Sequence, residues 1–174
     1  TRMHRAEWGP RGTRVVTSDA YWRQPLKWEA EAFTSGERKR VFCASVADVF
    51  EGQDTMPPEA HETVKAARSR LFDLIMVTPM LDWLLLTKRP ENAAAWFDER
   101  GQMTEDGGPL HNLWLGTSIE DQPTTDDRVP HLLRCPAVAR FLAVEPLLGP
   151  VDLERCGAIE WDAVGGSTGG GYRD

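Results

Sequence analysis

Cysteine is scarce in this sequence. Its 174 residues contain three cysteines, which lie far apart at Cys43, Cys135 and Cys156. None of them belongs to a CxxC pair or stands at metal-ligand spacing from a histidine, so the sequence predicts neither a disulfide framework nor a zinc site. Few and widely spaced thiols are typical of proteins in a reducing compartment, and we expect a cytoplasmic protein.

Long hydrophobic runs and an excess of basic residues are also missing. The most apolar stretch, 71–86, is interrupted by Asp73, Pro79 and Asp82, and it is too short to cross a bilayer. The chain has 20 Lys and Arg against 27 Asp and Glu, a formal net charge of −7. This acidic balance argues against a protein that coats nucleic acid. We therefore expect no membrane partner and no bulk nucleic-acid partner, but a small-molecule or nucleotide-like ligand.

Apolar runs and helical segments alternate from residue 40 onward. Short runs rich in β-formers predict buried strands at 40–46, 82–87, 112–118, 140–144 and 160–164. Three- and four-residue spacing predicts a helix over 64–78, and further helices are predicted to open at Pro90 and to carry Val129. Residues 1–39 are polar and lack strong periodicity, so we expect an irregular N-terminal segment.

This alternation predicts an α/β fold with a parallel sheet. The length and a hydrophobic content of 41% fit one domain over residues 1–174. Five strands are too few for a closed eight-stranded barrel, which needs roughly 200 residues or more. Because the chain begins at Thr1 and stops just after a glycine cluster, both ends look like cuts. Either the sheet is open, or it is a partial (β/α) barrel of parallel strands, truncated at both ends.

Every predicted strand ends in polar or glycine residues. The carboxyl ends of parallel strands meet at one edge of a sheet, where α/β proteins place their sites. The candidate substrate- or cofactor-binding residues are therefore Ser45, Asp48, Thr87, Lys88, Arg89, Thr117, Ser118, Glu120, Asp121, Glu145, Gly165, Gly166 and Ser167.

Each candidate also has a structural interpretation. Asp48 is placed to line a pocket or to cap the loop after the first strand. Lys88 and Arg89 suit an anion at a helix N-terminus, or pair with Glu91 or Asp82 in solvent. Thr117, Ser118, Glu120 and Asp121 suit a ribose or an amino group, or cap the next helix. Glu145 would be costly to bury without a partner, which Lys88, Arg89 or a cationic ligand would supply. The run 165–171 lets a backbone approach a ligand, or forms a flexible loop.

Four sequence blocks resemble, in order, the signature blocks of a family. They are RVFCASVADVF (40–50), LLLTKRPE (84–91), NLWLGTSIEDQ (112–122) and FLAVEPLLGPVD (141–152). The family comprises phage-associated, radical S-adenosylmethionine-like proteins of unknown function, and the resemblance covers roughly residues 20 to 173. It implies a partial barrel that holds S-adenosylmethionine and a 4Fe–4S cluster. The parent protein would cleave S-adenosylmethionine reductively and abstract hydrogen from a substrate that the sequence does not identify.

The resemblance also implies cluster ligands in a three-cysteine segment ahead of the region seen here. This chain contains no such segment, so we expect it to be inactive by itself. The family has Gly-Gly-Glu where this chain has Gly165, Gly166 and Ser167, and a Ser-Cys pair at the positions of Ala143 and Val144.

Two other functions fit the same residues. The chain would be a non-redox nucleotide binder or metal-dependent phosphoester hydrolase if Asp48, Glu120 and Glu145 held Mg²⁺ through their oxygens. It would be a degenerate, interaction-only protein if it bound neither nucleotide nor metal.

Overall fold

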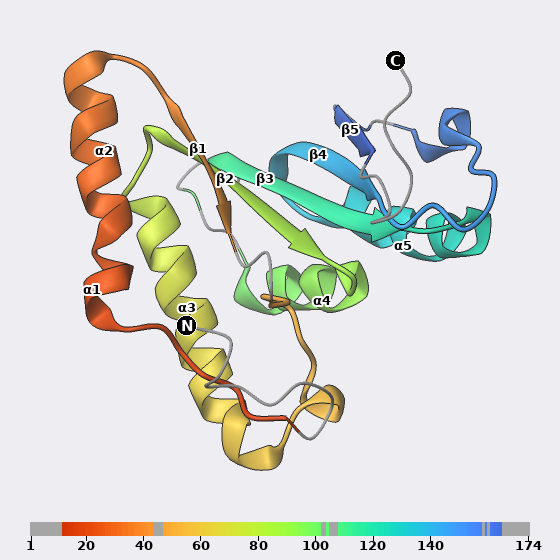
Figure 1. Ribbon diagram of the computed structural model, residues 1–174, viewed down its shortest axis with the longest axis horizontal. Coiled ribbons are helices and arrows are strands. Elements are labelled where there is room, and N and C mark those ends of the chain that lie inside the picture. Colours follow the sequence, from red (N-terminus) through yellow and green to blue (C-terminus); the bar gives the residue numbers. More distant parts are fainter. Residues whose placement is uncertain are drawn as a thin grey trace. The chain divides into compact units, whose positions relative to one another are not determined.

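The computed structural model of the protein is drawn in Figure 1. It describes residues 12–43, 47–101, 104, 108–157, 159 and 161–164. The chain divides into two compact units, and each is interrupted in sequence. The first unit comprises residues 1–40 and 51–82, and the second comprises residues 41–50 and 83–174.

The first unit is helical. It contains α1 (Asp19–Trp22), α2 (Gln24–Ser35), the short 3₁₀ helices η2 (Gln53–Thr55) and η3 (Pro58–Ala60), and α3 (His61–Met76). The expectation of an irregular segment before residue 40 was wrong, because α2 alone spans 12 residues. Pro25 lies in the first turn of α2, and Gly36 ends the helix with a φ of 71°, which a residue without a Cβ adopts at little cost.

The predicted helix over 64–78 is confirmed as α3. Its buried residues are Leu71, Phe72, Leu74 and Ile75, which gather in the last two turns. Thr78 follows the helix and is fully buried, and its hydroxyl donates to the carbonyl of Leu74 at 2.7 Å. This bond satisfies a carbonyl at the helix end that has no partner within the helix.

The sheet has the strand order β1-β2-β3-β4-β5. Its strands are β1 (Lys39–Cys43), β2 (Leu81–Thr87), β3 (Leu110–Ile119), β4 (Ala137–Val144) and β5 (Trp161–Val164). The pairs β2·β3, β3·β4 and β4·β5 are all parallel, with Thr87 opposite Thr117 in the first pair. The predicted mixed α/β fold with a parallel sheet is therefore confirmed for these four strands.

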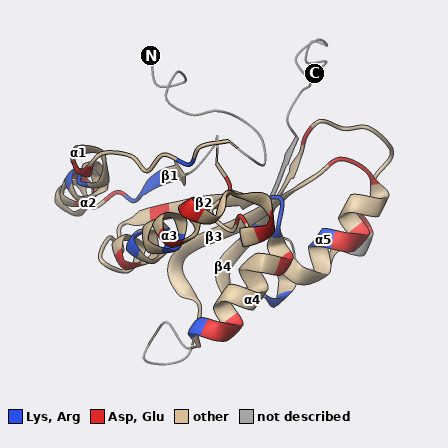
Figure 2. Ribbon diagram, turned by 90° about the horizontal axis from the view of Figure 1, so that it is seen from below, with Lys and Arg blue, Asp and Glu red and all other residues tan. Residues whose placement is uncertain are grey.

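Two helices cover the same side of the second unit's sheet (Figure 2). They are α4 (Pro90–Arg100) and α5 (Gln122–Arg134), which follow β2 and β3 and contact each other. A sequential strand order joined by right-handed crossovers puts successive helices on one face of a sheet. The ribbons of β3 and β4 carry almost no Lys, Arg, Asp or Glu in Figure 2, as their burial requires.

The core of the second unit lies between this sheet and its helices. Leu85, Leu113, Leu115 and Leu142 are fully buried strand residues, and Leu132 is their fully buried counterpart on α5. The described part of the link from β4 to β5 contains a short 3₁₀ helix, η4 (Leu153–Cys156). Among the described residues, no helix is long and apolar enough to cross a membrane.

Candidate functional site

An aromatic anchor fixes the described segment 47–50 that precedes η2. Phe50 is fully buried, and its ring lies 6.0 Å from those of both Trp96 and Phe97 on α4. The side-chain amide of Asn92, also on α4, donates to the Phe50 carbonyl at 3.0 Å. Because Asp48 stands only two residues earlier, this anchor holds its carboxylate at the carboxyl end of β2. The sequence analysis did not assign a role to Phe50.

The Asp48 carboxylate collects four hydrogen bonds. Its Oδ1 accepts from the Thr87 hydroxyl at 2.7 Å and from the Phe50 N–H at 2.9 Å. Its Oδ2 accepts from the Lys88 N–H and the Arg89 guanidinium, both at 3.0 Å. The Asp48 side chain is only 14% exposed, and four donors with one cation compensate the loss of water from it. Asp48 therefore caps its own loop, as one of its two interpretations predicted, and it also binds the end of β2. That it lines a ligand pocket stays a prediction.

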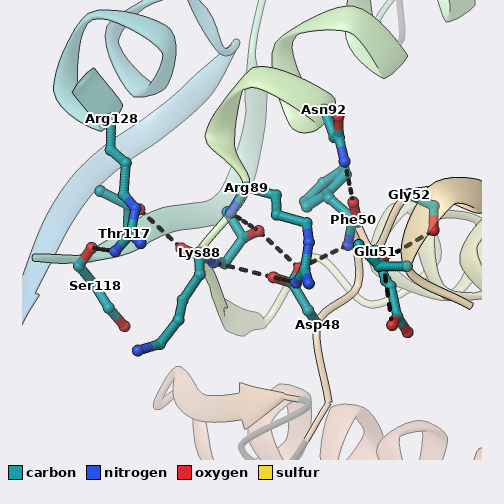
Figure 3. Close-up of polar contacts among 12 residues, drawn as sticks. Asp48, Phe50, Glu51, Gly52, Lys88, Arg89, Asn92, Thr117, Ser118 and Arg128 are labelled. Atoms are coloured by element: carbon teal, nitrogen blue, oxygen red, sulfur yellow. Dashed lines mark hydrogen bonds and ion pairs between the residues drawn. The ribbon is translucent and has the colours of Figure 1, made fainter. Parts of the chain in front are cut away.

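Lys88 and Arg89 point to different carboxylates. The Arg89 guanidinium lies against Asp48, whereas the Lys88 side chain extends away from Asp48 (Figure 3). The Lys88 ammonium instead binds Glu120 Oε1 at 2.7 Å. The alternative pairing of these cations with Glu91 or Asp82 is not what the structure has, because Glu120 and Asp48 take their place. Opposite directions follow from the alternation of side chains along extended backbone.

Glu120 is shared between two cations. Arg128, on α5, binds Glu120 Oε2 at 2.9 Å and also donates to the Ser118 carbonyl at 2.6 Å. Sequence reasoning missed Arg128. Its position seven residues after the cap of α5 was a signal, because residues two helical turns apart share a face. The pattern alone did not indicate that this face turns back toward the end of β3.

Hydroxyl groups join the ends of β2 and β3. The Thr117 hydroxyl donates to the Thr87 carbonyl at 2.8 Å, and the Thr87 hydroxyl accepts from the Arg89 N–H at 2.9 Å. Thr87, Thr117 and Ser118 are each at least 98% buried. The Thr87 and Thr117 hydroxyls therefore fix this edge from within, and all three residues are buried away from the surface.

Asp121 is the N-cap of α5, as the capping interpretation predicted. Its side chain accepts from the Thr124 N–H at 2.9 Å, and the Thr124 hydroxyl accepts from the Asp121 N–H, which completes a capping box. The hydrogen bonds from the Thr124 backbone and side chain hold the pKa of the Asp121 carboxyl below its usual value. This cap sets the direction of α5 and so the position of Arg128.

Glu145 lies at the surface, so the burial cost that singled it out does not arise. Its predicted partners Lys88 and Arg89 bind Glu120 and Asp48. The segment that follows Glu145 is held near Glu120, whose carbonyl accepts from the Leu148 N–H at 2.7 Å. Ser45, Gly165, Gly166 and Ser167, the other predicted site residues, lie outside the described residues.

No metal-ligand group is present in the part of the chain that the structure describes. The set of Asp48, Glu120 and Glu145 proposed for Mg²⁺ is not assembled there, since no three His, Cys, Asp or Glu side chains gather to hold an ion. Burial raises the pKa of the Cys43 thiol to about 11 and that of Cys135 to about 12. Both thiols are therefore protonated at neutral pH in the metal-free chain.

These contacts form one continuous cluster at the carboxyl ends of β2 and β3, which Asp48 joins from the segment 47–50. We call it the strand-end cluster, and it comprises Asp48, Thr87, Lys88, Arg89, Thr117, Ser118, Glu120 and Arg128. Lys88 joins its two halves, because its backbone N–H binds Asp48 and its ammonium binds Glu120. Carboxylates and cations side by side are suited to a ligand that carries charges of both signs.

Comparison with known proteins gives one family. Its model, described as "Protein of unknown function (DUF5131)", matches residues 1–174. No curated protein and no solved structure matches the chain. Because the family model spans the whole sequence, this chain belongs to the DUF5131 family of proteins of unknown function.

Proposed function

We propose that this chain forms the S-adenosylmethionine-binding part of a phage-associated, radical S-adenosylmethionine-type protein with a partial (β/α) barrel. The observation that carries the proposal is the strand-end cluster, in which Lys88 and Glu120 directly follow the parallel strands β2 and β3 and Asp48 binds the end of β2. Sequential parallel strands with α4 and α5 on one side are the arrangement from which (β/α) barrels are built, and barrels bind their ligands at that edge.

The chemistry of the strand-end cluster supports S-adenosylmethionine as the ligand. S-adenosylmethionine carries a carboxylate, an ammonium and a sulfonium group close together. Lys88 and Arg89 are partly exposed cations suited to the carboxylate, with 53% and 31% of their side chains accessible. Glu120 offers an acceptor for the ammonium or the sulfonium, since one of its oxygens is held by the displaceable Lys88 ammonium.

The described cysteines do not fit a 4Fe–4S cluster. Such a cluster takes its ligands from closely placed thiolates. Within the described residues, Cys43, Cys135 and Cys156 form no such group. In this proposal the ligands of the 4Fe–4S cluster come from residues that this chain does not contain. The chain alone binds S-adenosylmethionine without cleaving it.

Calorimetric titration of the chain tests the ligand. We expect micromolar binding of S-adenosylmethionine without any added metal, and at least tenfold weaker binding of ATP. Binding of ATP that requires Mg²⁺, with no binding of S-adenosylmethionine, would favour the non-redox nucleotide binder or phosphoester hydrolase instead. If the chain binds neither S-adenosylmethionine nor ATP, with or without Mg²⁺, the result would favour an interaction-only protein.

Iron and sulfide analysis tests the redox part separately. The analysis is made on anaerobically reconstituted protein expressed from the natural reading frame together with the codons upstream of Thr1. We expect about four iron and four sulfide per chain, which is the content of one 4Fe–4S cluster. A reconstituted protein without iron would reject the radical mechanism, even if the cofactor binds.

A further inference from the structure

Glu120 is bound by two cations that differ in exposure. The Glu120 side chain is 12% exposed and Arg128 is 18% exposed, whereas Lys88 is 53% exposed. Arg128 is fixed by a second bond, to the Ser118 carbonyl at 2.6 Å. Lys88 has its second contact through the backbone, where its N–H donates to Asp48. The Lys88 main chain is therefore held while its side chain reaches the surface.

Release of Lys88 from Glu120 leaves no buried charge unpaired. Glu120 keeps the Arg128 guanidinium on its other oxygen, at 2.9 Å. Ion pairs with a solvent-exposed partner contribute little to stability. A lysine side chain is also flexible and carries three rotatable donors, so it reorients readily toward another anion. Loss of Arg128 from Glu120 would be costly by comparison, because both side chains are largely buried.

We propose that Lys88 is the specificity-determining residue of the site and exchanges Glu120 for the carboxylate of the ligand. The inference rests on the proposed function and names the ligand group that Lys88 selects. When the ligand binds, the Lys88 ammonium turns to the incoming carboxylate, and the freed oxygen of Glu120 accepts the positive part of the same ligand. Ligands that lack the carboxylate gain nothing from Lys88, so the site discriminates against them.

A cycle of two ligands and two variants tests this exchange. The ligands are S-adenosylmethionine and its decarboxylated form, which keeps the ammonium and the sulfonium and lacks only the carboxylate. We expect the wild-type chain to bind S-adenosylmethionine about tenfold more tightly than the decarboxylated form, which corresponds to roughly 1.4 kcal/mol. Lys88→Ala should lose this preference by binding S-adenosylmethionine about tenfold more weakly, with little change for the decarboxylated ligand.

Matched variants make each outcome decisive. Lys27→Ala removes an exposed lysine from α2 and should leave both affinities unchanged. Lys88→Arg keeps the cation and should retain most of the preference, which a purely structural role of Lys88 would not predict. If Lys88→Ala weakens the binding of both ligands equally, or weakens the binding of neither, the exchange is overturned. The proposed function stands in that case. Failure of the wild-type chain to bind S-adenosylmethionine overturns both.

Discussion

Asp48 is the residue on which the strand-end cluster most depends. Its two oxygens accept from four donors on three segments: its own loop, the end of β2 and the residue that caps α4. A carboxylate is the side chain suited to this place, because it has only acceptors and a charge that Arg89 compensates. The identity of one residue therefore fixes how the segment 47–50, the end of β2 and the start of α4 meet.

Replacement of Asp48 by Asn should destabilise the protein strongly. The amide nitrogen cannot accept, so one pair of donors loses its acceptor and Arg89 loses its counter-charge. We expect a loss of roughly 2–4 kcal/mol in the free energy of unfolding, measured by urea denaturation. Asp54→Asn makes the same chemical change at an exposed residue of η2 and should cost less than about 0.5 kcal/mol. Similar losses for the two variants would contradict the role given to Asp48.

At the scale of elements, buried periodic segments were predictable and exposed ones were not. The strands β2 to β4 have nearly every side chain buried, so their sequences read as continuous apolar runs. Helix α2 buries only Pro25 and Ala32, and its large apolar residue Phe33 is 77% exposed, so hydrophobic spacing gave no signal. Its boundaries were nevertheless marked by Pro25 and Gly36, whose preferences are local.

The site was predictable to the extent that it follows from strand ends. Lys88 and Glu120 lie together because the parallel pairing of β2 and β3 brings their carboxyl ends to one edge, and Asp48, in the segment after β1, binds the end of β2. Arg128 was missed because its contribution depends on the direction in which α5 leaves β3. Phe50 was missed because its importance comes from packing against Trp96 and Phe97, which are distant in sequence.

The cap of α5 should give the protein a pH-dependent increment of stability. The folded-state pKa of Asp121 lies below its usual value. A lowered pKa contributes stability that is fully present above the unfolded-state pKa, near pH 4, and is lost as the pH falls through the folded-state pKa. We expect the wild-type chain to resist urea better than Asp121→Asn at pH 7. The difference should shrink below about pH 4.

Urea midpoints of the two chains, measured from pH 7 down to pH 3, check this sign. Asp126→Asn is a suitable control, since it changes an exposed carboxylate of the same helix that lies beyond the cap. A stability difference between the wild-type chain and Asp121→Asn that stays constant or grows on acidification would contradict the charge-based cap.

At the scale of the whole molecule, many of the described basic side chains form ion pairs with carboxylates. Within the second unit Lys88 and Arg128 share Glu120, Arg89 binds Asp48, and Arg134 on α5 binds Asp98 on α4. Within the first unit Arg14 binds Glu51, and Arg38 binds Asp82. Such pairing removes the clustered positive potential that phosphate backbones require, even where cations lie at the ligand edge.

This distribution predicts how the protein behaves toward polyanions. With a net charge of −7, the chain should pass through a heparin column at pH 7.5 and 50 mM salt and should bind a quaternary-amine column under the same conditions. Lys88→Ala should not change the heparin result, because the proposed role of Lys88 concerns one carboxylate and not an extended anion. Retention of the wild-type chain on heparin up to a few hundred millimolar salt would reveal a concentrated basic surface. Such a surface would favour a nucleic acid over a small zwitterion as the ligand. Binding of a basic surface to a polyanion releases many counterions at once, so the affinity falls steeply with salt.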